Sequence, residues 1–333
     1  DPLWSRGLGD VYKRQMQRGV LVESGAADEV LERPCHPYTR ALIAAVPPLA
    51  PAASRHAVAA DAPNILTTQA LSKTYRKRGW FGQPGRVTHA LDDVTLALRE
   101  GSTLGIVGES GSGKSTLARS LLGLLAPDAG AITLAGDTVT FKGSRARREH
   151  ARRVQMVFQD PYGSLNPRQR VGEIVARGPI VHGMPRREAW AQARELFELV
   201  GLSPDALRRY PHEFSGGQRQ RVGLARALAM RPRVLIADEP VSALDVSVQA
   251  QVLALLARLR EQLGLSIVFI THDLRVAAQV CDHIAVMKNG QVVEQGPCAE
   301  VFAAPAHPYT RALLAAVPGR RWDSDAAAAR QAA

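Results

Sequence analysis

A run of small residues, one lysine and two hydroxyl residues has the composition of a phosphate-binding loop. Residues 108–116 read GESGSGKST, which fits the pattern G-x-x-x-x-G-K-[ST]. Small residues let backbone N–H groups approach phosphate oxygens, and the start of a following helix adds its positive dipole end. Lys114 can then reach the β- and γ-phosphates, and the Ser115 hydroxyl can bind Mg²⁺. The chain is therefore predicted to bind a nucleoside triphosphate.

A second motif supplies two carboxylates. Residues 234–237 read VLIA, a short buried strand, and Asp238 and Glu239 follow at its end. An aspartate in this position can hold Mg²⁺ through its water ligands, and a glutamate can orient and polarise an attacking water. The alternative is a surface Asp-Glu pair that begins a turn, and the upstream phosphate loop makes it the weaker interpretation.

The elements that must position these residues alternate between strands and helices. Apolar runs predict strands at 64–75, 94–98, 104–107, 154–158, 234–237 and 265–271. Apolar periodicity predicts helices at 117–125 and 246–263, and a helical stretch interrupted by prolines from 160 to 231. On the second helix, one stripe carries Val248, Val252, Leu255, Leu256 and Leu259. This alternation predicts a largely parallel sheet covered on both faces, with the helical stretch as a separate lobe.

Residues 210–221, YPHEFSGGQRQR, form the most diagnostic stretch. Ser215 can cap the helix that follows it, and two glycines beside a capping serine make a second anion-binding helix start. With the phosphate loop upstream and Asp238-Glu239 downstream, the stretch resembles the signature sequence of ABC-type ATPases. Phe214 replaces the usual leucine of that family and leaves the phosphate-contacting residues intact.

The resemblance covers residues 64–319 and implies an α/β fold. The implied fold is a P-loop NTPase ABC-type nucleotide-binding domain with a RecA-like parallel-sheet core, an antiparallel β subdomain and a helical subdomain at about 160–232. It implies ATP and Mg²⁺ as cofactors and catalytic roles for Glu239, His272, Gln159 and Lys114. The implied Mg²⁺ ligands are Ser115, Gln159 and Asp238. The implied ATP contacts are Tyr75, Gly108, Ser110, Gly111, Gly113, Lys114, Ser115 and Thr116. Across a dimer, the partner's ATP would be contacted by Ser215, Gly216, Gly217 and Gln218.

Three further stretches resemble the ATPase subunits of oligopeptide/dipeptide importers: residues 158–168, 210–214 and 307–313. The resemblance implies an ATP-hydrolysing subunit for peptide import, with glutathione among the possible solutes. Implied partners are a second ABC ATPase domain, a permease that contacts residues 160–168, and a solute-binding protein indirectly, with no nucleic acid. The implied location is the cytoplasmic face of the inner or plasma membrane. Alternatives are a nickel or drug-efflux ATPase and a soluble ABC ATPase of DNA repair or translation.

One segment of the chain occurs twice. Residues 16–47 and 287–318 align without a gap at an offset of 271 residues, and both contain His-Pro-Tyr-Thr-Arg-Ala-Leu. The second copy ends a domain, so the first is interpreted as the tail of an earlier, truncated unit. The predicted segments are that tail (16–50), a linker (51–63), the complete unit (64–319, with its own tail from about 297) and a flexible end (320–333).

The first fifteen residues are predicted to be non-native. One reverse translation of residues 5–15, SRGLGDVYKRQ, resembles a transposon adaptor used to make sequencing libraries. The net charge of the 333-residue chain is +11, but only six of its 42 basic residues are lysines, a bias more typical of a GC-rich genome than of a nucleic-acid surface. Three isolated cysteines indicate a reducing compartment and no disulfide scaffold.

Overall fold

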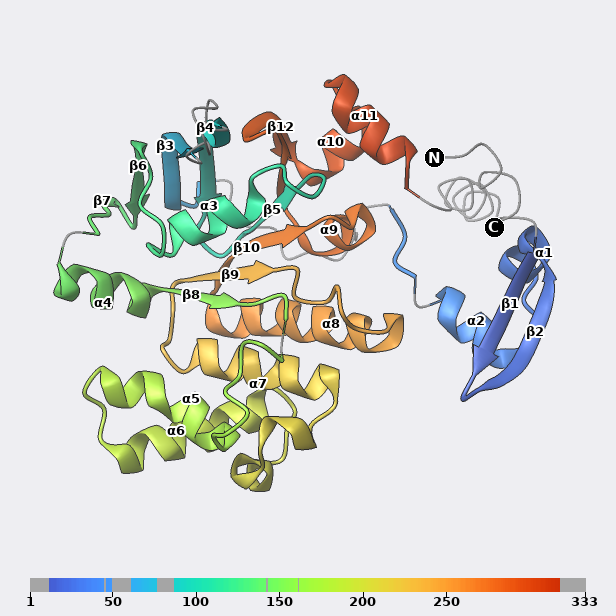
Figure 1. The fold of residues 1–333 in the computed structure, drawn as a ribbon, viewed down its shortest axis with the longest axis horizontal. Helices are drawn as coiled ribbons and strands as arrows, with labels where there is room; N and C mark the ends of the chain where they lie inside the picture. Colours follow the sequence, from blue (N-terminus) through green and yellow to red (C-terminus); the bar gives the residue numbers. More distant parts are fainter. Residues whose placement is uncertain are drawn as a thin grey trace, which may run out of the picture.

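The computed structural model describes residues 12–44, 46–49, 61–76, 87–141, 143–160 and 162–317. Most of three predicted segments lies outside these residues: the non-native stretch, of which residues 1–11 are not described, the linker and the flexible C-terminal end. Figure 1 shows the larger body of the described chain as a central sheet with helices on both of its faces.

A six-stranded sheet in the order β12-β11-β5-β10-β9-β8 forms the centre of this body. Strands β11, β5, β10, β9 and β8 run parallel, and β12 pairs antiparallel with β11 at one edge. Parallel neighbours need long crossover connections, which explains the alternation of strands and helices along the sequence. The strands are β5 (Thr103–Val107), β8 (Val154–Val157), β9 (Val234–Asp238), β10 (Ser266–Thr271), β11 (His283–Lys288) and β12 (Gln291–Pro297).

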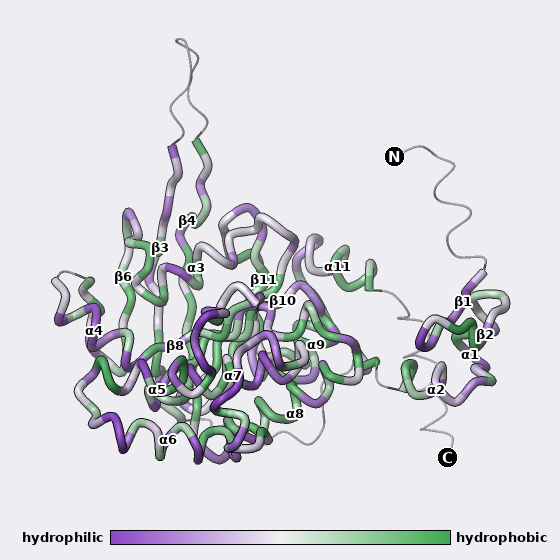
Figure 2. Tube along the Cα trace, turned by 60° about the horizontal axis from the view of Figure 1, so that its bottom comes forward, coloured by the Kyte–Doolittle hydropathy of each residue, from purple (hydrophilic) through white to green (hydrophobic). Residues whose placement is uncertain are grey.

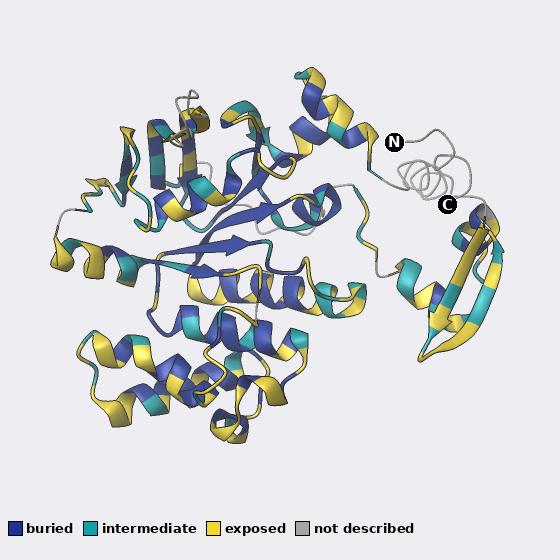
Figure 3. Cartoon of the chain, viewed as in Figure 1, coloured by how far each residue is buried: buried dark blue, intermediate teal, exposed yellow. Residues whose placement is uncertain are grey.

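Side chains of the central strands alternate between two hydrophobic cores. In β9, Leu235 and Ala237 pack into the core shared with the helices, whereas Val234 and Ile236 pack into the core under a second sheet. Every residue of β5, β9 and β10 is buried, as the dark blue of these strands in Figure 3 shows. Burial on both faces is the reason that these strands read as continuous apolar runs.

The predicted antiparallel β subdomain is a four-stranded sheet in the order β4-β3-β6-β7. Helix α3 (Lys114–Leu121) contributes Leu117, Ala118 and Leu121 to the core between this sheet and the central one. The strands are β3 (Asn64–Arg76), β4 (Val87–Arg99), β6 (Ala129–Leu134) and β7 (Asp137–Thr138), and helix α4 (Ser144–Arg153) leads from them to β8.

The predicted helical subdomain packs below the central sheet in Figure 1. It comprises α5 (Val171–Val181), α6 (Arg186–Leu199), the 3-10 turns η2 (Pro204–Arg208) and η3 (Pro211–Glu213), and α7 (Gly216–Leu228). Helix α8 spans Val246–Leu263, as predicted, and its predicted apolar stripe faces the core, with Val248 only partly buried. A shorter helix, α9 (Leu274–Val280), follows β10.

Some predicted limits are wrong. The helix after the phosphate loop ends at Leu121 rather than at residue 125, because Gly123 takes a positive φ of 70° that breaks the helical turn. Strand β4 begins at Val87 rather than at residue 94, since hydrogen bonds to β3 hold a segment that lacks apolar alternation. Strands β6 and β7 and helix α4 were not expected as separate elements.

The duplicated segment folds into the same local unit twice, element for element. The first copy contains the last two residues of β1 (Tyr12–Gln17) and all of β2 (Val20–Ala26), α1 (Ala27–Glu32) and α2 (Pro37–Ala44). The second contains the last two residues of β11 and all of β12, α10 (Cys298–Ala303) and α11 (Pro308–Ala315). Glu23 accepts the N–H groups of Cys35 and His36, and Glu294 accepts those of Ala306 and His307. In both copies, contacts within the segment therefore stabilise the turn before the second helix.

The two hairpins differ in what surrounds their first strand. β11 has four consecutive buried residues inside the central sheet, whereas β1 pairs with β2 in a two-stranded sheet. β1 carries the hydrophilic residues 13–15 (KRQ) where β11 carries IAV. The sequence agreement of the two copies begins at Met16. The assignment of residues 1–15 as non-native and the proposed domain limits remain predictions.

The distribution of hydrophobic residues agrees with the layers of the central body. Figure 2 shows apolar residues gathered in the strands and helices of the central body, with hydrophilic residues on its outside. Among the described residues, no helix combines the length and apolar character needed to cross a membrane.

A partly buried ion pair ties α8 to the central sheet and generates a first prediction. Asp282 Oδ2 accepts hydrogen bonds from Arg260 Nη1 (2.6 Å) and from the Thr103 N–H (2.7 Å). Removing the carboxylate leaves the arginine, whose side chain is 10% exposed, without its counter-ion. We expect Asp282→Ala to lower the free energy of unfolding in urea by about 2–4 kcal/mol.

The matched control is Glu100→Ala. Glu100 pairs with Arg233 at 2.7 Å on the surface, where both side chains are more than 40% exposed. Exposed pairs stabilise by about 1 kcal/mol at most. Equal losses from the two variants would contradict the role of the buried pair.

Candidate functional site

The predicted phosphate loop leaves β5 at its carboxyl end and closes into α3. Backbone φ is positive at Gly108, Gly111 and Gly113. A Cβ at Gly113 would collide with the carbonyl oxygen of Ala90, so glycine is required there. No side chain caps the start of α3, and its first N–H groups therefore remain available to an anion.

Lys114 lies buried at the base of the loop. Its ammonium group donates to the carbonyl oxygens of Gly108 (2.7 Å) and Glu109 (2.8 Å). Burial lowers the pKa of Lys114, while the carboxylates of Glu239 and Asp238 oppose that shift. The lysine is thus pre-oriented by the loop that it serves.

Three predicted catalytic residues meet in front of the loop. Gln159 follows β8, Glu239 follows β9 and His272 follows β10, so that three adjacent parallel strands deliver them to one edge of the sheet. Gln159 Nε2 donates to one carboxylate oxygen of Glu239 at 2.7 Å, and His272 Nδ1 lies 3.1 Å from the other. Glu239 has a positive φ of 44°, a backbone conformation that side-chain-bearing residues adopt uncommonly.

The predicted metal ligands offer oxygen donors suited to a hard cation. Asp238 is 9% exposed, and burial, followed by the neighbouring Glu239, raises its pKa, whereas Lys114 opposes the rise. A divalent cation would relieve this crowding of negative charge. Hydroxyl, amide and carboxylate oxygens of Ser115, Gln159 and Asp238 have the chemistry that Mg²⁺ prefers.

A cavity of about 540 Å³ brings most of these residues together. Loop residues, Gln159 and Glu239 line it. It is also lined by Val87 to Ala90 and Asn289, from the start of β4 and the turn between β11 and β12. These residues form no sequence motif, so only the folded chain identifies them.

Tyr75, the predicted adenine-stacking residue, is 41% exposed on β3 and does not line this cavity. Its register partner on β4, Thr88, does line it. The stacking role of Tyr75 remains a prediction.

The signature residues lie at the start of α7 and do not line this cavity. As predicted, Ser215 caps the helix: its hydroxyl accepts the Gln218 N–H, and Gln218 Oε1 accepts the Ser215 N–H in return. Phe214 is buried in the core shared by the central sheet and the helices, a position that suits an apolar side chain. The separation of the signature from the phosphate loop agrees with a role toward another domain.

An apolar groove of about 450 Å³ lies beside Gln159, between β8 and α5. Exposed Phe158, Leu124 and Val181 line it, together with Arg177 and Arg226. The guanidinium of Arg219 stacks 3.6 Å from the ring centre of Tyr162. Arg226, which lines the groove, donates to the carbonyl oxygen of Ser164, so the predicted permease-contacting loop is joined to the groove.

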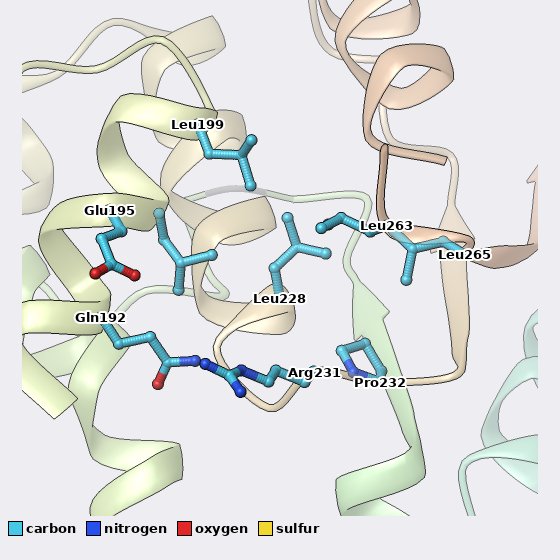
Figure 4. A pocket seen from close by; sticks show the side chains of 9 residues that line it. Gln192, Glu195, Leu199, Leu228, Arg231, Pro232, Leu263 and Leu265 are labelled. Atoms are coloured by element: carbon cyan, nitrogen blue, oxygen red, sulfur yellow. The ribbon is translucent and has the colours of Figure 1, made fainter. Parts of the chain in front are cut away.

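A further cavity of about 530 Å³ lies among α6, α7 and the end of α8 (Figure 4). Leucine side chains converge on it, including Leu199, Leu228 and Leu263, with Gln192 and Arg231 at one side. It contains none of the predicted site residues, and its lining suits packing rather than phosphate chemistry.

Comparison with known proteins agrees with this geometry. The family model for ABC transporters matches residues 91–242, and the model for the C-terminal region of oligopeptide/dipeptide transporters matches residues 22–85 and 293–332. The chain is 42% identical over 327 residues to the glutathione import ATP-binding protein GsiA of Escherichia coli O157:H7, covering 91% of this chain and 52% of that protein. The chain thus spans about half the length of the curated relatives that it matches.

Solved structures agree as well. CbiO1 of Clostridium perfringens, part of an ABC transporter complex, superposes with a TM-score of 0.62 at 30% identity over 72% of this chain and 91% of that one. The dimeric structure of a bacterial ABC transporter cassette gives the same TM-score and identity over 70% of this chain and 98% of that one. Since the fold, the phosphate loop and the sequence all agree, the chain belongs to the ATP-binding cassettes of ABC transporters, a family of ATPases, and carries the C-terminal region of the oligopeptide/dipeptide type.

Proposed function

We propose that the chain binds and hydrolyses ATP to energise a membrane importer of peptides, with dipeptides, oligopeptides and glutathione as the candidate solutes. The observation that carries the proposal is the contact of Gln159 and His272 with Glu239 in front of the phosphate loop. The C-terminal region and the glutathione-importing relative support the solute class.

In the proposed reaction, loop N–H groups and Lys114 hold the phosphates, and Glu239 orients and polarises the water that attacks the γ-phosphate. Gln159 and His272 bracket the Glu239 carboxylate and restrict where that water can lie. Ser115, Gln159 and Asp238 would hold Mg²⁺, which supplies positive charge to the phosphate oxygens. The chemistry is then mainly positioning and charge stabilisation.

A second ATP-binding cassette completes the proposed site. Ser215 to Gln218 lie away from the chain's own phosphate loop but present a capped helix start, which would contact ATP held by the partner domain. The dimeric form of a structural relative supports this arrangement. The candidate partners are a fused unit, a second copy of this chain and a different ATPase chain.

The permease partner fits the groove beside Gln159. Exposed Phe158, Leu124 and Val181 would receive an apolar segment, and Gln159, the residue after Phe158, would connect that contact with ATP hydrolysis. We propose that the chain lies at the cytoplasmic face of the membrane, with a solute-binding protein as an indirect partner.

Glu239→Gln tests the proposed water-activating residue. The amide keeps the shape of the side chain but cannot accept a proton, so we expect ATP binding to persist and hydrolysis to slow by roughly 10²–10⁴-fold. Single-turnover hydrolysis and equilibrium ATP binding measure the two effects. Glu188→Gln, an exposed glutamate at the start of α6, serves as the control. Near-normal hydrolysis by Glu239→Gln would remove this residue from the mechanism.

Lys114→Ala tests the phosphate loop itself. Loss of the ammonium removes a charged donor to phosphate and the contacts that orient Gly108 and Glu109. We expect ATP affinity to fall by about 10- to 100-fold, measured by calorimetry. Arg186→Ala, an exposed basic residue, should bind ATP normally. Unchanged affinity in Lys114→Ala would place the nucleotide elsewhere.

Solute uptake tests the importer proposal. We expect deletion of the full gene in its source organism to abolish uptake of at least one of labelled dipeptide, oligopeptide or glutathione. The wild-type gene, but not its Glu239→Gln variant, should restore that uptake. Normal uptake of all three solutes after deletion would reject peptide import, and a selective loss of nickel uptake would point to the metal alternative.

A further inference from the structure

The C-terminal segment of the complete unit touches the phosphate loop. The Tyr309 hydroxyl, from the first turn of α11, accepts a hydrogen bond from the Glu109 N–H at 3.2 Å. The turn between β11 and β12 also contacts the loop, because the Gly290 N–H donates to the Ser112 carbonyl oxygen at 2.9 Å. The loop is therefore held from outside the cavity as well as by its own lysine.

Tyr309 and Lys114 hold the same peptide unit from opposite ends. The Gly108 carbonyl and the Glu109 N–H belong to one planar peptide. Its oxygen accepts from Lys114 Nζ at 2.7 Å, and its N–H donates to Tyr309. A flip of this peptide would break both contacts at once, so the tyrosine hydroxyl stabilises the orientation in which the carbonyl supports the lysine.

Tyr309 is itself fixed by its surroundings. It is 8% exposed, and the Lys288 ammonium lies 4.5 Å from the centre of its ring. The Glu294 carboxylate accepts the N–H groups of Ala306 and His307, and His307 Nδ1 accepts the Tyr309 N–H. This series of contacts leads from β12 through the start of α11 to the phosphate loop.

We propose that Tyr309 is a positioning residue of the ATP site, through which the C-terminal segment sets the nucleotide affinity of its own unit. The inference rests on the proposed function, because it assumes that the loop binds ATP. The tyrosine acts on Lys114 through the Gly108–Glu109 peptide and does not itself contact the nucleotide. Its effect therefore falls on binding rather than on the chemical step.

The duplication provides an internal control. Tyr38 holds the same place in the first copy, and its N–H likewise donates to His36. The described part of the chain contains one phosphate loop, and that loop lies against Tyr309. Tyr38→Phe and Tyr309→Phe therefore make the same chemical change, one beside a phosphate loop and one without.

The experiment compares ATP binding and steady-state hydrolysis of the wild-type chain and the two variants. We expect Tyr309→Phe to raise the Kd and KM for ATP by about 3- to 10-fold, the effect of one lost hydrogen bond, with kcat within about twofold. Tyr38→Phe should match the wild type. The thermal midpoint of Tyr309→Phe should fall by no more than a few degrees, since phenylalanine keeps the buried ring and one hydrogen bond is lost.

Glu294→Gln provides a second, independent variant. It weakens the anchor of the same turn, so it should raise the Kd for ATP in the wild-type background but have little further effect in Tyr309→Phe. Glu23→Gln is its counterpart in the first copy and should leave the Kd unchanged.

The outcomes separate this inference from the proposed function. Failure of the wild-type chain to bind ATP would reject the proposed function itself. Wild-type binding with equal Kd values for Tyr309→Phe and Tyr38→Phe would overturn the positioning role alone. A lower thermal midpoint with unchanged Kd would also overturn it, since that pattern indicates a purely structural tyrosine.

Discussion

The register of the central parallel strands is the constraint on which the rest of the structure depends. Ile270 pairs with Asp238, Thr271 with Val107 and Val157 with Ala237, so the carboxyl ends of four strands reach one edge together. Each strand feeds alternate side chains into two cores. A slip of one residue would reverse those faces and withdraw Glu239 from the site at the same time. Core packing and the geometry of the candidate site therefore depend on the same strand register.

Charged side chains are buried at the same edge of the sheet. Burial lowers the pKa of Lys114 and raises that of Asp238, because burial disfavours the charged form of each group. Neighbouring groups of opposite charge oppose both shifts. The phosphates and the metal ion of the proposed substrate would supply partners of the required signs. The site is thus arranged so that a bound nucleotide improves the electrostatics of the folded chain.

The two copies of the C-terminal segment share a local structure but differ in what they contact. Glu23 and Glu294 stabilise the same turn in the same way, because all of their partners lie within the segment. Only the second copy lies against the phosphate loop, through Tyr309. The sequence of the repeat therefore determines its local structure, whereas its position in the fold determines which residues it contacts.

The amino-acid sequence by itself determined the elements with strong periodicity and the motifs of continuous residues. Helix α8, the buried strands, the phosphate loop and the Ser215 cap could all be predicted because neighbouring residues specify them. The end of α3, the extent of β4 and strands β6 and β7 depended on distant partners, and the sequence left them open. Only the tertiary structure brought Gln159 and His272 to Glu239, placed Asn289 in the cavity and set Tyr309 against Glu109. These contacts join residues that are far apart in the chain. Local sequence patterns do not specify the distances between such residues, because those distances depend on how the strands and helices pack.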